Sequence, residues 1–365
     1  MKIHRFLDQL EKQKTDLEKL INQVKEVSDS SELITAISES EVLKDLDLSH
    51  VYLDAVPSNV RQLNNLTSLN LYNNKLTELP PEIGQLTNLT SLNLSHNRLE
   101  SLPAEIGQLT KLTELNLRYN RGLDWADTFN KLAPLTKLTS LDLSYNYRTE
   151  LPAEIGQLIN LTSLNLYNNK LTELPAEIGQ LTNLTSLNLD LNNLTELPVE
   201  IGQLTNLTEL NLYRNKLTDL PDELWQLTQL TSLHLRGNNL TELPVEIGQL
   251  TQLISLDLRE NNLTKLPAEI GQLTQLTSLN LHGNNLETLP AEIGQLTNLT
   301  HLDLGWNELK RKSLPSSIGQ LINLTSLNLN SNRLTSLPVK IRQLTNLTHL
   351  DLGGRGAFDS YRLEN

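Results

Sequence analysis

One nine-residue pattern, Leu-x-x-Leu-x-Leu-x-x-Asn, recurs along nearly the whole chain and limits what the chain can fold into. Its twelve full copies begin at Leu66, Leu89, Leu112, Leu138, Leu161, Leu184, Leu207, Leu230, Leu253, Leu276, Leu299 and Leu324. The step is 23 residues, except for 26 before Leu138 and 25 before Leu324. Such a period is typical of a solenoid, in which each unit buries its apolar side against the next. We therefore expect one array of stacked units in place of several globular domains.

Two weaker copies flank the twelve full ones. The first has Leu43, Leu46 and Leu48 with Val51 at the Asn position, and the last has Leu347, Leu350 and Leu352 with Arg355 there. With them the array has fourteen units, and weakened end copies fit the atypical repeats that cap such arrays. The predicted organisation is an N-terminal helical cap over residues 1–42, a repeat domain over 43–354 and a tail over 355–365.

Each copy predicts a short strand followed, on the other side of the unit, by a single helical turn. In "SLNLY", Leu69 and Leu71 alternate with polar residues, so the two leucines point inward and the polar residues outward. The next asparagine, Asn74, ends the strand. In "LPAEIGQL", Pro103 suits the first position of a helical turn and Ile106 points inward from it. Stacked units of this kind place their strands in one parallel sheet.

The spelling "LPAEIGQLTNLTSLNLYNNKLTE" resembles the leucine-rich repeat family, and the resemblance covers roughly residues 43–354. It is similar to the class of Ras-group scaffold proteins and of bacterial, notably cyanobacterial, arrays, some of which precede a Roco GTPase module. The resemblance implies an α/β fold class: a solenoid shaped as a curved horseshoe, with a parallel β-sheet on the concave face and short helical turns on the convex face. It also implies that Asn74 and its equivalents are buried and satisfy backbone groups of adjoining turns.

The two ends of the chain differ from the array. Residues 1–27 carry apolar side chains in alternating steps of four and three, namely Ile3, Leu7, Leu10, Leu17, Ile21 and Val24. This spacing predicts an amphipathic helix that packs over the first repeat, forms a coiled-coil dimer or docks on another protein. In the tail, Phe358, Tyr361 and Leu363 either fold over the last unit or the array continues into a further segment.

The two longer units each contain an insertion. The 26-residue unit introduces Trp125 and Phe129, which are expected either in a longer helix with both rings packed inward or in a protruding docking feature. The 25-residue unit adds Lys310, Arg311 and Lys312, for which we expect a solvated loop.

Comparison of the repeats separates constant positions from variable ones. The inward Leu, Ile and Asn columns scarcely change, whereas the two outward positions after the third leucine vary. Variation on the concave face predicts a recognition surface, because Tyr, Trp and Arg most often carry the energy of protein interfaces; drift at relaxed solvent-facing positions is the alternative. Candidate partner-binding residues near the amino end are Tyr72, Arg118, Tyr119, Tyr145 and Tyr167. A second set, expected to form a cationic and aromatic patch, is Tyr213, Arg214, His234, Arg236, Arg259, His282 and Trp306.

Composition argues against several classes of partner and chemistry. The formal net charge of -13 repels phosphate backbones and anionic lipid, so we expect no nucleic-acid partner and no membrane partner. Without cysteine the chain has no thiolate nucleophile and no thiolate-bound zinc. No segment has the apolar length of a signal peptide core or a membrane helix, so a cytoplasmic location is expected.

No pattern points to catalysis. HExxH, GxSxG and phosphate-loop motifs are absent, and no spacing brings Ser, His and Asp together. His301 with Asp303, and His349 with Asp351, each share a strand face, with His282 nearby, but a metal site needs three or four converging ligands. We expect no catalytic residue, no metal site and no cofactor.

The leading hypothesis is a non-enzymatic protein–protein interaction scaffold that binds a protein partner on the concave face. The resemblance to Ras-group and Roco-associated arrays makes a small GTPase or a signalling domain the partner to expect. The apolar spacing of residues 1–27 adds a possible dimer through the N-terminal helix. Two alternatives stay open: the regulatory or sensor region of a larger signalling enzyme such as a Roco-type GTPase, and a bacterial surface or exported adhesin.

Overall fold

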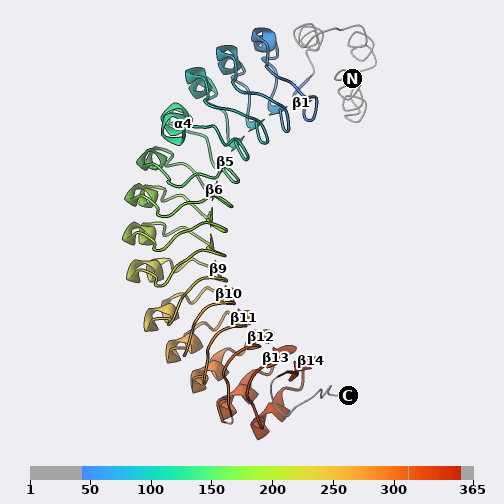
Figure 1. Cartoon of the computed structure of the whole chain (residues 1–365), viewed down its shortest axis with the longest axis vertical. Helices are drawn as coiled ribbons and strands as arrows, with labels where there is room; N and C mark the ends of the chain where they lie inside the picture. The colour runs from blue at the N-terminus through green and yellow to red at the C-terminus, as the bar shows by residue number, and fades with distance from the viewer. Residues whose placement is uncertain (1–42, 311, 355–365) are drawn as a thin grey trace. The chain divides into compact units, whose positions relative to one another are not determined.

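The computed structural model describes residues 43–310 and 312–354. The chain divides into two compact units, a first unit Met1–Lys170 and a second unit Leu171–Asn365 (Figure 1). The predicted helical cap over residues 1–42, with its amphipathic helix and dimer contact, lies outside the described residues. So do Arg311 and the tail over residues 355–365.

Every described repeat contributes one three-residue strand centred on its second leucine. The first unit holds β1 (Asp45–Asp47), β2 (Ser68–Asn70), β3 (Ser91–Asn93), β4 (Glu114–Asn116), β5 (Ser140–Asp142) and β6 (Ser163–Asn165). The second unit holds β7 (Ser186–Asn188), β8 (Glu209–Asn211), β9 (Ser232–His234), β10 (Ser255–Asp257), β11 (Ser278–Asn280), β12 (His301–Asp303), β13 (Ser326–Asn328) and β14 (His349–Asp351). Within each unit the strands pair in parallel with leucine opposite leucine, as Leu69 with Leu92 and Leu256 with Leu279. This register places equivalent residues of successive repeats side by side.

The outer side of each unit is built from 3₁₀ turns. The first unit holds η1 (Ser58–Gln62), η2 (Pro81–Gln85), η3 (Ala104–Gln108) and η4 (Ala153–Gln157). The second unit holds η5 (Ala176–Gln180), η6 (Val199–Gln203), η7 (Asp222–Gln226), η8 (Val245–Gln249), η9 (Ala268–Gln272), η10 (Ala291–Gln295), η11 (Ser316–Gln320) and η12 (Val339–Gln343). Pro103 has an extended backbone and directly precedes η3, so it is not the first residue of the turn, as the sequence predicted, but the residue before it.

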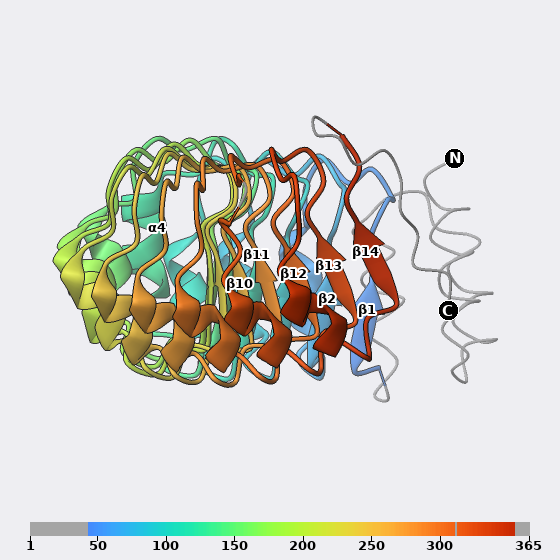
Figure 2. The same ribbon diagram turned by 90° about the horizontal axis from the view of Figure 1, so that it is seen from below.

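Strands and turns occupy opposite sides of each unit. The strands line the concave side and the turns the convex side (Figure 1), and the turns of the second unit lie next to one another in a row (Figure 2). The predicted α/β solenoid, with a parallel sheet and short helical turns, is confirmed.

Leucine and isoleucine fill the interior, and a column of asparagines joins one repeat to the next. Asn284 is 5% exposed, and its Oδ1 accepts a hydrogen bond from the Leu263 N–H at 3.1 Å. Its Nδ2 donates to the carbonyl oxygens of Leu258 and Leu281, at 2.9 and 3.0 Å. Asn74 makes the same kind of contacts, with the Leu53 N–H and two carbonyl oxygens. The predicted burial and pairing of these amides is confirmed.

The 26-residue repeat, which lies in the first unit, contains α4 (Trp125–Leu132), the one α-helix among the described residues. Trp125 and Phe129 are 3% and 0% exposed, with ring centroids 6.1 Å apart, so both rings pack inward and the docking-feature alternative is wrong. In the 25-residue repeat Lys310 and Lys312 are exposed, as a solvated loop requires. No helix in the described part of the chain has the length and apolar character to cross a membrane.

Candidate functional site

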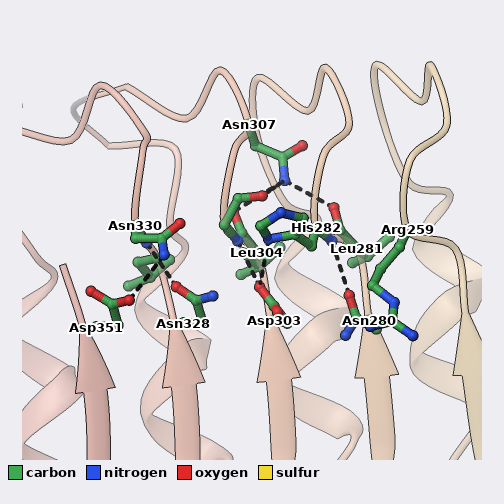
Figure 3. A network of polar contacts seen from close by, with 12 residues as sticks. Arg259, Asn280, Leu281, His282, Asp303, Leu304, Asn307, Asn328, Asn330 and Asp351 are labelled. Atoms are coloured by element: carbon green, nitrogen blue, oxygen red, sulfur yellow. Dashed lines mark hydrogen bonds and ion pairs between the residues drawn. The ribbon is translucent and has the colours of Figure 1, made fainter. Parts of the chain in front are cut away.

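The variable residues stand on a turn that a strand side chain stabilises. The Asn70 Oδ1 accepts the N–H of Tyr72 at 3.0 Å, and the same contact joins Asn280 to His282 at 3.1 Å. Figure 3 shows a row of such side chains at the ends of successive strands, from Asn280, Asp303, Asn328 and Asp351. A side-chain oxygen that accepts the N–H two residues on forms an Asx turn. This outward column is therefore mostly Asn or Asp for a structural reason, while the residues it presents are free to vary.

The second variable residue of each repeat has a left-handed backbone. The angle φ is 53° at Asn73 and 69° at Gly283, residue types that tolerate this conformation, but also 60° at Tyr145, 50° at Arg214 and 54° at Trp306. A bulky residue in this region costs on the order of 1 kcal/mol. The bulky side chains therefore occupy these positions at a cost to the fold, as residues of binding surfaces often do.

Six rings form a continuous row along the first unit, which we call the aromatic ladder: His50, Tyr72, His96, Tyr119, Tyr145 and Tyr167. Successive ring centroids lie 4.9, 5.1, 4.5, 6.2 and 5.2 Å apart. These are separations at which aromatic pairs attract one another. The four tyrosines were all predicted candidates, and the structure brings them into one row.

Two arginines lie on this ladder. The Arg118 guanidinium is 4.1 Å from the ring centroid of Tyr145. The Arg121 guanidinium is 4.5 Å from the centroid of Tyr119 and 4.1 Å from that of Tyr147, and it donates to the Tyr119 hydroxyl at 2.6 Å. In residues 43–310 and 312–354 neither arginine forms a salt bridge. A guanidinium held over a ring still has N–H groups that can bind a carboxylate.

His96 carries little of the positive charge of the ladder at neutral pH. Partial burial, and then the positive charges of Arg118 and His50, lower the pKa of His96 from its ordinary 6.5. A hydrogen bond with the Tyr167 hydroxyl lowers the pKa of the Tyr145 phenol from its ordinary 10.0. The fixed cations of this surface are therefore its arginines.

The variable columns of the sequence did not predict four side chains of this surface: His50, His96, Arg121 and Tyr147. The two histidines belong to the same column as Tyr119, so a comparison of this column in every repeat could have found them. Arg121 and Tyr147 directly follow the conserved asparagine. Their column is separated from the two variable columns by that asparagine alone.

The second candidate set is only partly contiguous. The guanidiniums of Arg214 and Arg236 lie 5.3 and 5.2 Å from the ring centroid of Tyr213. Trp306 is 52% exposed and lies four repeats further along the chain. The set therefore consists of one small cluster around Tyr213 and residues spread along the following repeats.

The second set is not the cationic patch that the sequence predicted, because carboxylates of the same or the next repeat neutralise two of its three arginines. The Arg236 Nη2 is 2.6 Å from the Glu260 Oε1. Arg259 donates to both carboxylate oxygens of Asp257, from Nε at 3.0 and 3.1 Å and from Nη2 at 2.7 Å. These hydrogen bonds raise the pKa of Arg259, so the pair stays charged but has no net charge. The prediction failed because it left out the carboxylates of Asp257 and Glu260.

Two side-chain pairs offer parts of a catalytic or metal site, and neither is complete. The Ser232 Oγ and the His234 Nε2 are 2.9 Å apart, a contact that the spacing did not predict. A hydrolase also needs a carboxylate to orient the imidazole, and His234 forms no other side-chain hydrogen bond within the described residues. The His282 Nδ1 is 3.6 Å from the Asp303 Oδ1 (Figure 3). The described residues hold no group of three or more His, Cys, Asp or Glu side chains placed to bind a metal.

The family comparison agrees with this architecture. The model of a leucine-rich repeat region matches residues 23–140, 125–234 and 220–307. A model of two leucine-rich repeats matches residues 322–360, and a model of a single repeat matches residues 298–321. A search of the curated proteins gives no match.

Solved structures of the same kind are similar over most of the chain. The leucine-rich repeat protein LIC12759 of Leptospira interrogans is 41% identical, with a TM-score of 0.82 over 88% of this chain and 86% of that one. The internalin InlF of Listeria monocytogenes is 25% identical, with a TM-score of 0.76 over 96% of this chain and 94% of that one. The plant peptide hormone receptor RGFR1, in complex with RGF2, is 30% identical, with a TM-score of 0.53 over 88% of this chain and 61% of that one.

Proposed function

The chain belongs to the leucine-rich repeat family, and on that premise we propose that it is a non-enzymatic scaffold that binds a protein partner through the variable residues on the strand side of its repeats. Leucine-rich repeat domains commonly bind proteins, and the RGFR1 structure holds RGF2. The similarity to LIC12759 supports a bacterial origin.

The observation that carries this proposal is the aromatic ladder with its two arginines. Across the repeats the inward Leu, Ile and Asn columns are buried, whereas the variable columns gather rings and guanidiniums. Tyr and Arg are enriched where protein interfaces carry most of their energy. A small GTPase or another signalling domain in the cytoplasm is the partner we propose, by resemblance to Ras-group and Roco-associated arrays.

Affinity capture from the native lysate tests the proposal, with mass spectrometry to identify what is retained. The baits are the wild-type chain, a first-unit variant (Arg118→Glu with Tyr145→Ala) and a second-unit variant (Arg236→Glu with Tyr213→Ala). The matched control, Lys265→Glu with Gln249→Ala, changes two exposed side chains away from the variable columns. We expect wild type and control to retain the same protein, and at least one site variant to lose it.

Three other results would contradict the scaffold. Equal capture by all four baits would place the interaction elsewhere on the molecule. Hydrolysis of GTP or of a simple ester by the purified chain would make the protein an enzyme or part of one. Recovery of the protein outside the cell in a fractionated culture would favour the adhesin alternative.

A further inference from the structure

A second row of side chains runs beside the aromatic ladder and is basic only in the first unit. It consists of the residue that directly follows the conserved asparagine position of each repeat. In the first unit this column reads Tyr52, Lys75, Arg98, Arg121, Tyr147 and Lys170, all exposed, and we call it the basic edge. In the second unit it reads Asn193, Lys216, Asn239, Asn262, Asn285, Glu308 and Arg333. The basic edge therefore has four cations and no carboxylate, while the second unit has mostly asparagine at the same positions.

The basic edge and the aromatic ladder form one surface. Arg121 connects them, because its guanidinium contacts the ring of Tyr119 in the ladder and the ring of Tyr147 in the edge. Elsewhere along the edge the Lys75 Nζ lies 5.7 Å from the ring centroid of Tyr52, and the Lys170 Nζ lies 5.3 Å from that of Tyr147. Three of the four cations of the basic edge therefore lie near ring faces.

Four cations of this surface are not neutralised by a carboxylate. In the residues that the structure describes, Lys75, Arg98, Arg118 and Arg121 form no salt bridge. In the second unit, by contrast, Arg333 at the equivalent position is paired with Glu308 at 2.7 Å.

The charge of the two units differs in the same direction. Residues 43–170 contain 11 Lys and Arg against 13 Asp and Glu, a formal charge of -2. The described part of the second unit contains 10 Lys and Arg against 19 Asp and Glu, a formal charge of -9. Residues 43–170 therefore repel a negatively charged ligand less than the second unit does, and their basic edge is a local cluster of positive charge.

We propose that the basic edge and the aromatic ladder of the first unit bind an acidic, extended segment of a protein partner. The inference rests on the proposed scaffold function and names the unit, the side chains and the partner chemistry. Arginine N–H groups bind carboxylates in charge-assisted pairs, and the ring edges next to them contact apolar side chains. From Lys75 to Lys170 the edge spans four repeat steps, roughly 19 Å at about 4.8 Å per step, a length that about six extended residues cover.

A peptide fits this surface better than a polyphosphate does. Carboxylates of the neighbouring strands, from Asp45, Glu114 and Asp142, lie on the outward face of the same repeats. A polyphosphate, which carries a negative charge on every phosphate group, would be repelled by these carboxylates as well as attracted by the cations. A peptide with acidic side chains at alternate positions can direct them to the cations and place apolar ones against the rings.

Direct binding of short peptides to the full chain tests this inference. The probes are fluorescein-labelled seven-residue peptides of alternating Glu and Leu, of alternating Gln and Leu and of alternating Lys and Leu, together with a single-stranded oligothymidylate of matched charge. Fluorescence anisotropy gives the affinity at low salt and again after salt is added. The proteins are the wild type, the variant Arg118→Gln with Arg121→Gln, and a control, Lys216→Gln with Arg333→Gln, that removes the same charge from the second unit.

We expect the Glu peptide alone to bind, with an affinity that falls as salt is added. The first-unit variant should bind it at least about tenfold more weakly, because two charge-assisted contacts are lost, and the control should match wild type. Equal binding of the Glu and Gln peptides, preference for the oligothymidylate, or an equal loss in both variants would overturn the inference. Circular dichroism spectra of the two variants that match wild type establish that any loss is not unfolding.

This result is separable from that of the scaffold experiment. If the lysate partner is captured and the Glu peptide neither binds nor displaces it, the scaffold stands and this inference falls. If the Glu peptide binds through Arg118 and Arg121 while the lysate yields no partner, the acidic-segment site stands and the scaffold proposal falls.

Discussion

The imidazole of His96 stacks on the ring of Tyr119, with centroids 4.5 Å apart and planes within 3° of each other. The two residues come from neighbouring repeats and share the same column, with left-handed backbones at φ 55° and 59°. Equivalent positions in a parallel register place their side chains next to each other, so one ring per repeat is enough to build a continuous aromatic row. The stack also joins a titratable group to the candidate binding surface.

The stability of the first unit should depend on pH through His96. Its folded pKa is lowered from 6.5, mainly by burial, so the neutral imidazole is favoured in the fold and its contribution is complete above about pH 6.5. As the pH falls through that value the unfolded chain takes up the proton first, and this contribution is lost. His96→Asn, which places at this position a residue type that tolerates a left-handed backbone, should flatten the fall in melting temperature between pH 7.5 and 5.5. Identical pH profiles for wild type and variant would contradict the assignment.

The asparagine column allows a comparison of two adjacent residues with the same side chain. Asn284→Ala should lower the free energy of unfolding by about 2 to 3 kcal/mol, because one N–H and two carbonyl groups lose their buried partner. Asn285→Ala changes the exposed neighbour and should alter stability by less than about 0.5 kcal/mol. Urea unfolding measures both, and equal effects would show that burial of the amide does not matter.

The spacing of the outer turns should depend on glycine at one position. A Cβ on Gly202 would lie 2.5 Å from the Glu223 carbonyl oxygen of the next turn, so Gly202→Ala should destabilise the second unit by about 1 to 3 kcal/mol. At Gly107 the closest atom is the Pro134 Cγ at 3.1 Å, because the longer unit follows, and Gly107→Ala should cost less than about 0.5 kcal/mol. Thermal unfolding distinguishes the two, and a neutral Gly202→Ala would mean that the turns can separate.

The second variable position, which has a left-handed backbone, allows two opposite substitutions to be compared within the second unit. Leu191 has φ 55° and is a poor residue type for that backbone, so Leu191→Asn should raise the free energy of unfolding by about 0.5 to 1 kcal/mol. Gly283 has φ 69°, and a Cβ added there would have no atom closer than 3.6 Å, so Gly283→Leu should lower it by about 1 kcal/mol through the backbone alone. A loss of stability in Leu191→Asn would show that the leucine side chain packs usefully.

The candidate site could be predicted only in part. Tyr119, Tyr145 and Tyr167 were expected to be neighbours because they follow the strands of consecutive repeats, and the leucine-to-leucine register places them so. The salt bridges that Arg236 and Arg259 form with carboxylates could not be predicted in the same way. A long arginine side chain can reach several neighbours, and whether it turns to a ring or to a carboxylate depends on which side chains the adjoining repeats present.

The sequence by itself determined the solenoid, its strand positions and the buried columns of leucine and asparagine, because one pattern with a nearly constant period admits one way of stacking. The tertiary structure decided the charge of each surface. Two sets of aromatic and basic residues that look alike in the sequence differ once folded. Carboxylates neutralise Arg236 and Arg259 of the second set, and ring faces hold the arginines of the aromatic ladder, since charge pairing depends on side-chain contacts that the period does not specify.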